Sequence, residues 1–238
     1  MLRNGVAIAD RIEAVRENIA RAAARAGRSA AAVRLMAVTK TVGEEAIRAA
    51  VTAGIDLLGE NYVQEAKRKI ELLGRRCEWH LIGRLQTNKA KYAVRLFDMI
   101  QAVDRLELAL ELDRRARQAG RVVPVLVEVN IAAEATKSGV PLEAAQELVR
   151  AILPLAGLSL QGLMTMPPWF DDSEDARPYF AALRRLRDRL AADGISLPHL
   201  SMGMSQDYEV AIEEGATIVR IGRAIFGERP AAAGGKRS

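Results

Sequence analysis

Lys40 follows directly on a run of apolar residues, in the stretch LMAVTKT (35–41). Such a run predicts a buried strand, and a lysine at its end needs an explanation because a buried ammonium group is costly unless it is paired or neutralised. An amine held in a partly buried site can also attack an aldehyde and form a Schiff base. Lys40 is therefore either an ordinary solvated charge or the nucleophile of a covalent site.

Polar side chains also stand at the ends of the other apolar runs that predict strands. If those strands are parallel and close into a barrel, their carboxyl ends meet at one mouth, where the active sites of barrels lie. An amine, a guanidinium, an amide and several hydroxyl groups at one mouth suit an anionic ligand. The strand-end residues are Lys40, Glu60, Asn61, His80, Arg84, Asp104, Asn130, Thr165, Ser201, Ser205 and Arg220.

Short runs rich in Val, Ile and Leu alternate with longer stretches of helical spacing. The expected strands are 33–40, 56–61, 78–83, 97–103, 123–130, 160–166, 198–203 and 217–222. The expected helices are 7–26, 43–53, 61–73, 88–95, 104–119, 141–153, 174–192 and 206–214. This alternation predicts an α/β protein, a single (β/α)8 TIM barrel with an extra N-terminal helix. The alternative is an open doubly wound sheet, but TKTVGEE stands where that fold usually carries G-x-G-x-x-G.

Composition excludes several classes of protein. The 238 residues carry 35 basic and 30 acidic side chains, only 4% are aromatic, and no basic block interleaves with aromatics, so nucleic acid is not an expected partner. One cysteine and two histidines predict no disulfide and no metal site. The N-terminus does not resemble a signal peptide and no run of 18 apolar residues occurs, so we expect no membrane partner and a cytoplasmic location. We expect residues 1–230 to form one barrel and 231–238 a disordered tail.

The last two predicted strands end in loops that suit a phosphate group. LSMGMS (200–205) and VRIGRAIFG (219–227) combine hydroxyls, Arg220 and the glycines Gly203 and Gly222. Barrels often bind phosphate after strands seven and eight, and glycine lets an anion approach the backbone closely. A lysine facing such a site can bind the aldehyde of a sugar phosphate, as in a Schiff-base aldolase, or that of pyridoxal 5′-phosphate (PLP). Spacing alone does not choose between the two.

The longer motifs resemble one family. AVTKT (37–41), GENYVQE (59–65), WHLIGRLQTNK (79–89), VNIAAEATKSGV (129–140), GLMTMPP (162–168) and the stretch 200–229 are similar to the YggS/PROSC family of PLP-binding proteins, the PLP homeostasis proteins. The resemblance covers nearly the whole chain. It implies a barrel like the N-terminal domain of alanine racemase and of fold-type III PLP enzymes. It also implies that Lys40 carries the cofactor as an internal aldimine.

The same resemblance assigns further cofactor-binding roles. Asn61 matches the residue that lies against the ring, and Arg220 matches the arginine directed at the pyridine nitrogen. A fixed cation there disfavours a second positive charge on the ring. Met164 is expected to pack near the ring, and His80 is interpreted as a core histidine rather than a catalytic one. The residues that match the phosphate loops are Ser201, Gly203, Ser205 and Gly222.

Two positions depart from the family pattern, and the roles of two lysines in matched motifs are undecided. Val42 stands where some members have a second lysine, and Arg223 where some have a small hydroxyl residue. The first departure puts a role for a second amine in doubt, and the second puts one phosphate hydrogen bond in doubt. Lys89 and Lys137 lie in matched motifs, where they are either ligands or solvated loop residues.

The resemblance implies a carrier more than an enzyme. We expect a monomeric protein that holds PLP as a reversible Schiff base on Lys40 in intracellular PLP homeostasis, with apo-PLP enzymes as possible recipients and no catalytic residue. The alternative is a fold-type III enzyme such as a weak amino-acid racemase. Racemisation needs a second proton donor, and the tyrosines nearest the mouth, Tyr62 and Tyr208, are not clearly placed for it.

Overall fold

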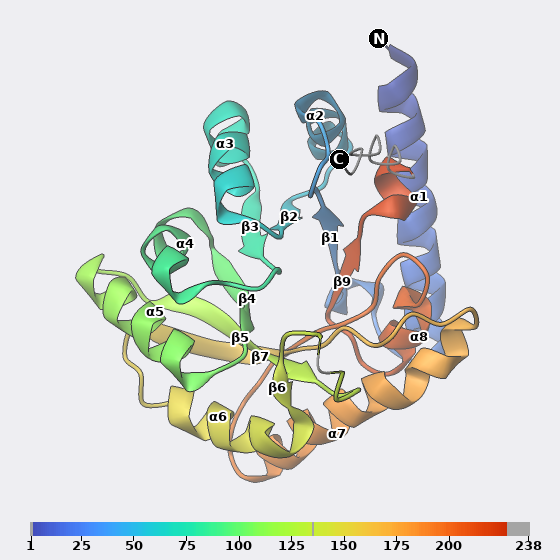
Figure 1. Ribbon diagram of the computed structural model, residues 1–238. Helices are drawn as coiled ribbons and strands as arrows, with labels where there is room; N and C mark the ends of the chain where they lie inside the picture. The colour runs from blue at the N-terminus through green and yellow to red at the C-terminus, as the bar shows by residue number, and fades with distance from the viewer. Residues whose placement is uncertain (1, 135, 228–238) are drawn as a thin grey trace, which may run out of the picture.

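Parallel strands close into a barrel in the computed structural model, which describes residues 2–134 and 136–227 (Figure 1). Strands that follow one another around the ring pair in parallel, β1 also pairs with β9, and the β4–β5 pairing completes the closure; the β4–β5 and β5–β7 pairs each contain a shift of register. Within the described residues the ring has eight strands: β1 (Arg34–Val38), β2 (Leu57–Glu60), β3 (Glu78–Leu81), β4 (Met99–Val103), β5 (Val123–Asn130), β7 (Leu158–Met164), β8 (His199–Ser201) and β9 (Ile218–Ile221). The predicted (β/α)8 barrel is confirmed.

Helices surround the ring, as Figure 1 shows. They are α1 (Leu2–Arg25), α2 (Glu44–Thr52), α3 (Val63–Leu73), α4 (Ala90–Leu96), α5 (Leu106–Gln118), α6 (Ala145–Ile152), α7 (Arg177–Ala192), α8 (Tyr208–Glu213) and α9 (Arg223–Phe226). The 3-10 turns of residues 2–134 and 136–227 are η1 (Ala30–Ala32), η2 (Thr87–Lys89), η3 (Leu142–Ala144) and η4 (Ser173–Ala176). In the described part of the chain, no helix has the length and apolar character needed to cross a membrane.

Several features were not expected in this form, among them the 3-10 turns η2 and η4 at the start of the expected helices 88–95 and 174–192. A strand of two residues, β6 (Val140–Pro141), pairs with β5 in addition to the ring, and the expected helix 141–153 begins as η3 before it becomes α6. A two-residue strand is too short to produce an alternating pattern in a sequence. The predicted tail, 231–238, lies outside the described residues.

The core has two layers because successive residues of a strand point to opposite faces. The larger layer lies between strands and helices and contains the fully buried Trp79, Phe97 and Phe180. The interior of the ring holds two small apolar clusters: Met36, Val38, Leu57, Ile82 and Ile218, and then Met99, Leu126 and Met164. Polar side chains share this interior and are at most 3% exposed: His80, Gln101, Glu128, Ser201 and Arg220.

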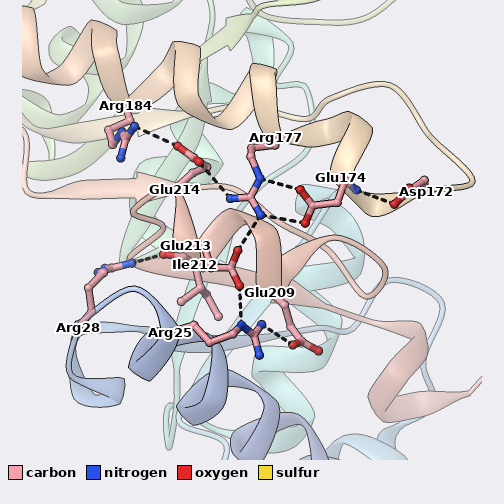
Figure 2. Close-up of polar contacts among 10 residues, drawn as sticks. All are labelled: Arg25, Arg28, Asp172, Glu174, Arg177, Arg184, Glu209, Ile212, Glu213 and Glu214. Carbon is pink, nitrogen blue, oxygen red and sulfur yellow. Dashed lines mark hydrogen bonds and ion pairs between the residues drawn. The ribbon is translucent and has the colours of Figure 1, made fainter.

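An ion-pair network joins the first and seventh helices to α8 (Figure 2). Arg177, at the start of α7, contacts Glu213 at 2.7 Å and Glu214 at 3.1 Å. Arg25, at the end of α1, contacts Glu213 at 2.7 Å and Glu209 at 2.9 Å. Because Glu213 is shared by both arginines, the network connects the N-terminal helix to the last third of the chain.

Candidate functional site

Lys40 lies at the mouth of the barrel, in the loop that follows β1. Met36 and Val38 face the ring interior, and the alternation of the strand turns Lys40 in the same direction. A cavity of about 560 Å³ occupies this mouth, and Lys40 is one of its lining residues. A ligand in the cavity therefore meets the amine.

Side chains of α3 hold the backbone directly before and directly after Lys40. Lys69 of α3 donates to the backbone carbonyl of Thr39 at 2.5 Å and to Glu65 at 2.8 Å. Glu65 in turn accepts from the backbone N–H of Thr41 at 2.7 Å. Thr41 has a φ of 62°, a left-handed conformation that β-branched residues rarely adopt. The bond from its N–H therefore secures a strained residue directly after the lysine.

Glu60 does not reach the cavity, contrary to the expectation that all strand-end polar groups meet there. Its fully buried carboxylate accepts from Lys69 at 2.6 Å and from the hydroxyl of Thr39 at 2.6 Å. Burial raises the pKa of Glu60 above its usual range, although the hydrogen bond from Lys69 opposes the shift. Alternation explains the outcome, because Glu60 points outward to α3 while Asn61, the next residue, lines the cavity.

Arg220 lies at the floor of the cavity on β9, with 3% of its surface exposed. Its Nη1 donates to the hydroxyl of Ser201 at 2.8 Å, and its Nη2 donates to the carbonyl of Thr165 at 2.8 Å. Burial lowers the pKa of Arg220 to about 10. The guanidinium is therefore still protonated at neutral pH, and two of its five N–H groups are used below the cavity.

The loops after β8 and β9 form one wall of the cavity. Ser205 and Gly222 line it, and the hydroxyl of Ser205 accepts from the backbone N–H of Ala224 at 3.2 Å, which joins the two loops. Asp207 closes the first loop by accepting from the backbone N–H of Met204 at 2.6 Å. The wall therefore presents a hydroxyl and backbone groups to the cavity.

Three residues that the family resemblance assigned to the cofactor lie behind the lining. Met164 is fully buried and packs with Met99, while Ser201 is fully buried under Arg220. Gly203 has a φ of 90°, and a Cβ there would lie 2.6 Å from the Cβ of Ala211. These residues shape the floor and wall, whereas Lys40, Asn61, Ser205, Arg220 and Gly222 line the cavity itself.

Several other strand-end groups are used elsewhere. His80 is buried in the ring interior, Asp104 is ion-paired with Arg105 at 2.6 Å, and Asn130 and Thr165 bond to backbone groups. The mouth that the sequence predicts is therefore correct in position, but it contains fewer of the strand-end groups than expected.

The two lysines left open by the sequence have different surroundings. Lys137 lines the cavity, but its amine is ion-paired with Glu134 at 2.7 Å and donates to the carbonyl of Pro167 at 3.1 Å. Lys89 lines a neighbouring cavity of about 660 Å³, which shares Asn61 and Arg84 with the first. Lys137 is therefore the one of the two that a ligand at the mouth can meet.

None of the four tyrosines, all of which are described, lines the mouth cavity. Tyr208 is 5% exposed, and its hydroxyl accepts from Asn18 of α1 at 2.8 Å. Tyr62 is 62% exposed and lines the neighbouring cavity. Neither of the two tyrosines expected nearest the mouth is placed in it.

Sequence reasoning missed some groups around the site. The sequence does not distinguish Lys69 from the other charged residues of its predicted helix, yet Lys69 is 5% exposed and holds the Lys40 loop. Gln101 is buried, and its place as a polar residue in the apolar run FDMIQAV is a signal for an inward-facing polar group. Glu128 is 2% exposed and accepts from Ser138, and burial raises its pKa to about 7.

Comparison with known proteins shows which family this chain is similar to. Residues 11–230 match the family model of the alanine racemase N-terminal domain. A protein of Aquifex aeolicus named pyridoxal phosphate homeostasis protein is 49% identical over 92% of this chain and 97% of its own length. The solved structure of PipY from Synechococcus elongatus PCC7942 with PLP bound is 34% identical, has a TM-score of 0.81 and is matched over 92% of this chain and all of its own. The structure of PipY without PLP matches with a TM-score of 0.83 and 35% identity, over 92% of this chain and 100% of its own.

Proposed function

This chain belongs to the family of the alanine racemase N-terminal domain, and from that premise we propose that it binds pyridoxal 5′-phosphate at the barrel mouth and serves in the intracellular homeostasis and carriage of this cofactor. One observation supports the proposal above the others: Lys40 and Arg220 line the same cavity of about 560 Å³. When bound, the cofactor supplies an aldehyde that an amine can attack and a pyridine ring that accepts electrons.

The residues of the cavity fit such a ligand. Its charged lining residues in the described part of the chain are Lys40, Arg84, Lys137, Asp207, Arg220 and Arg223, five cations and one carboxylate. A lining with this excess of positive charge favours a ligand that carries a phosphate group. Asn61 lines the cavity with Lys40 and can contact an aromatic ring, and Ser205 and Gly222 present a hydroxyl and backbone groups to the same cavity.

In this proposal Lys40 forms a reversible Schiff base with the aldehyde. Arg220 faces the ring nitrogen, and Ser205 and Gly222 hold the phosphate. Met164, Ser201 and Gly203 act from behind the lining by shaping its floor. Val42 packs against the outer core and is not among the residues that line the cavity, so Lys40 acts without a second amine from that position.

Carriage is favoured over catalysis by two features. Arg220 remains protonated at neutral pH, and a cation beside the ring nitrogen disfavours protonation of that nitrogen, which weakens the ring as an electron acceptor. The tyrosines, which would be the obvious second proton donors for a racemase, lie outside the cavity. We therefore propose a monomeric cytoplasmic carrier whose recipients are apo-enzymes that use the same cofactor, with weak amino-acid racemisation as the competing function.

A spectroscopic titration tests this proposal. PLP is added to wild type, to Lys40→Ala and to Lys137→Ala, a matched variant that removes another amine of the same cavity. We expect the absorbance band of covalently bound cofactor in wild type and Lys137→Ala, and its loss in Lys40→Ala. The same samples are assayed for exchange of the α-proton of alanine in deuterated water. Rapid exchange would favour the racemase, and a band that survives in Lys40→Ala would contradict the proposal.

A further inference from the structure

A continuous chain of hydrogen bonds leaves Arg220 and crosses the interior of the barrel. Nη1 of Arg220 contacts Oγ of Ser201 at 2.8 Å, and that oxygen contacts Oε1 of Gln101 on β4 at 2.6 Å. Nε2 of Gln101 contacts Nδ1 of His80 on β3 at 2.9 Å. These four side chains are between 0% and 3% exposed, so water does not compete for their bonds.

The direction of each bond follows from the arginine. A guanidinium has only donors, so Ser201 must accept from Arg220 and has one proton left to give. That proton goes to Oε1 of Gln101, which leaves the amide N–H₂ facing His80. If the amide were reversed, Ser201 would face two donors and its own proton would lose its acceptor.

His80 is consequently restricted to one protonation state. Its Nδ1 must be an unprotonated acceptor, so the ring is neutral and carries its proton on Nε2. Nε2 lies 3.4 Å from Glu78, which also pairs with Arg34 at 2.9 Å. Burial lowers the pKa of His80, which favours the same neutral form against the opposing effect of Glu78. Other charged groups that act on this ring are Asp98, Arg34 and, when protonated, His199.

Two carboxyl groups lie within electrostatic reach of Arg220, in addition to its hydrogen-bond partners. Asp207 and Glu128 both raise its pKa against the effect of burial, so each attracts the guanidinium. A rotation toward either carboxylate would change which N–H groups of Arg220 face the cavity, which Asp207 also lines. Bonds to Ser201 and to the carbonyl of Thr165 oppose that rotation.

We propose that Ser201, Gln101 and His80 are positioning residues, which hold the guanidinium of Arg220 in the orientation in which it meets the ring nitrogen of a bound cofactor. The part of this inference that concerns the ring rests on the proposed function, whereas the bond directions do not. Gln101 is the central residue, because within the described part of the chain it joins the hydroxyl of Ser201 to the imidazole of His80.

The bond directions are tested by nitrogen NMR on the full chain without added cofactor. The two histidines, His80 and His199, are distinguished with the variant His199→Gln. We expect Nδ1 of His80 to be unprotonated and Nε2 to be protonated in wild type. Gln101→Glu, which offers an acceptor to both neighbours, should move a proton onto Nδ1. A wild-type His80 that is protonated on Nδ1 would overturn the chain of bonds.

The positioning role is tested by cofactor affinity. Gln101→Met keeps the side-chain volume and removes both hydrogen bonds, and Met99→Leu is the matched control on the same strand of the ring interior. We expect PLP to bind roughly tenfold more weakly to Gln101→Met, as for the loss of one hydrogen bond, and to bind Met99→Leu like wild type. Equal affinity of the two variants would overturn the inference.

The two kinds of failure remain distinguishable. If wild type itself does not bind PLP, the proposed function fails, and the role of Arg220 at the ring fails with it. If wild type binds PLP but Gln101→Met binds it equally well, only the positioning role fails. Should Gln101→Met not fold, Ser201→Ala removes the adjoining link and must weaken binding relative to Met99→Leu.

Discussion

Lys69→Met is the substitution that most directly tests how the Lys40 loop is held. Lys69 donates to the carbonyl of Thr39, to Glu60 and to Glu65 at 2.5, 2.6 and 2.8 Å, and it is 5% exposed. Methionine has a similar shape but no charge, so Glu60 would be left buried without its cation. Removing one member of a buried ion pair costs about 3–5 kcal/mol of the free energy of unfolding.

The size of this loss depends on pH, because Glu60 can take up a proton. Its pKa is already raised by burial in the wild type, and removal of Lys69 raises it further. A carboxyl group whose pKa is raised by folding stabilises the folded state at pH values below its unfolded-state pKa. This stabilisation is lost as the pH rises through the folded-state pKa. The variant should therefore be closest to wild type near pH 5. It should lose up to about 1.4 kcal/mol per pH unit as the pH rises from the unfolded-state pKa of Glu60 to its new folded-state pKa, and no more above that value.

Urea unfolding followed by far-UV circular dichroism at pH 5 and pH 8 measures the difference. Lys67→Met is the matched control, since Lys67 lies two residues away on α3, is 62% exposed and pairs with the exposed Glu71 at 3.7 Å. We expect it to change the free energy of unfolding by less than about 0.5 kcal/mol at both pH values. Equal losses in the two variants, or a loss for Lys69→Met that does not grow with pH, would refute the role given to this lysine.

Three further substitutions test other parts of the structure. Gly162→Ala should unfold the barrel or destabilise it by more than about 3 kcal/mol, because the new Cβ would lie 2.0 Å from the carbonyl oxygen of His199. Gly43→Ala is the control, since a Cβ at Gly43 meets no atom within 4 Å and should be tolerated. Thermal melts compare the two variants. Thr41→Gly should raise the free energy of unfolding by about 1 kcal/mol through relief of its left-handed conformation, and Thr41→Val should not. Arg177→Ala should lower the free energy of unfolding by about 1 kcal/mol in low salt and by less in 1 M salt, because the ion-pair partners of Arg177 in Figure 2 are only partly buried. A loss that does not depend on salt would indicate that Arg177 stabilises the fold by packing instead.

The fold could be predicted because its local signals agree. Most ring strands fall in short apolar runs, and most of the helices that follow them have mixed charges at helical spacing. Gly27, directly after the end expected for the first helix, adopts a φ of 65°. Strand ends also located Lys40 and Arg220 at the mouth, since parallel strands in a barrel bring their carboxyl ends together.

What could not be predicted depends on contacts between distant elements. Glu60 ends a strand and is therefore expected at the mouth. Strand alternation turns it outward, but nothing in the sequence indicates that Lys69 on the next helix pairs with its carboxylate. Gln101 and Ser201 are 100 residues apart, and nothing in the spacing of either indicates that they share a hydrogen bond. Positions of this kind follow from closure of the ring, which brings β4 and β8 to face each other across the interior.

Borohydride reduction of the full chain after addition of PLP, followed by peptide mass mapping, tests the central claim most directly. Among the described residues, the amines of Lys40 and Lys137 line the mouth, and those of Lys69 and Lys89 lie nearby. We expect the mass of the reduced cofactor on the peptide that contains Lys40, and no trapping in Lys40→Ala. Reduced cofactor on Lys137 or Lys89 with an unmodified Lys40, or no trapping at all, would contradict the assignment of Lys40 as the covalent anchor.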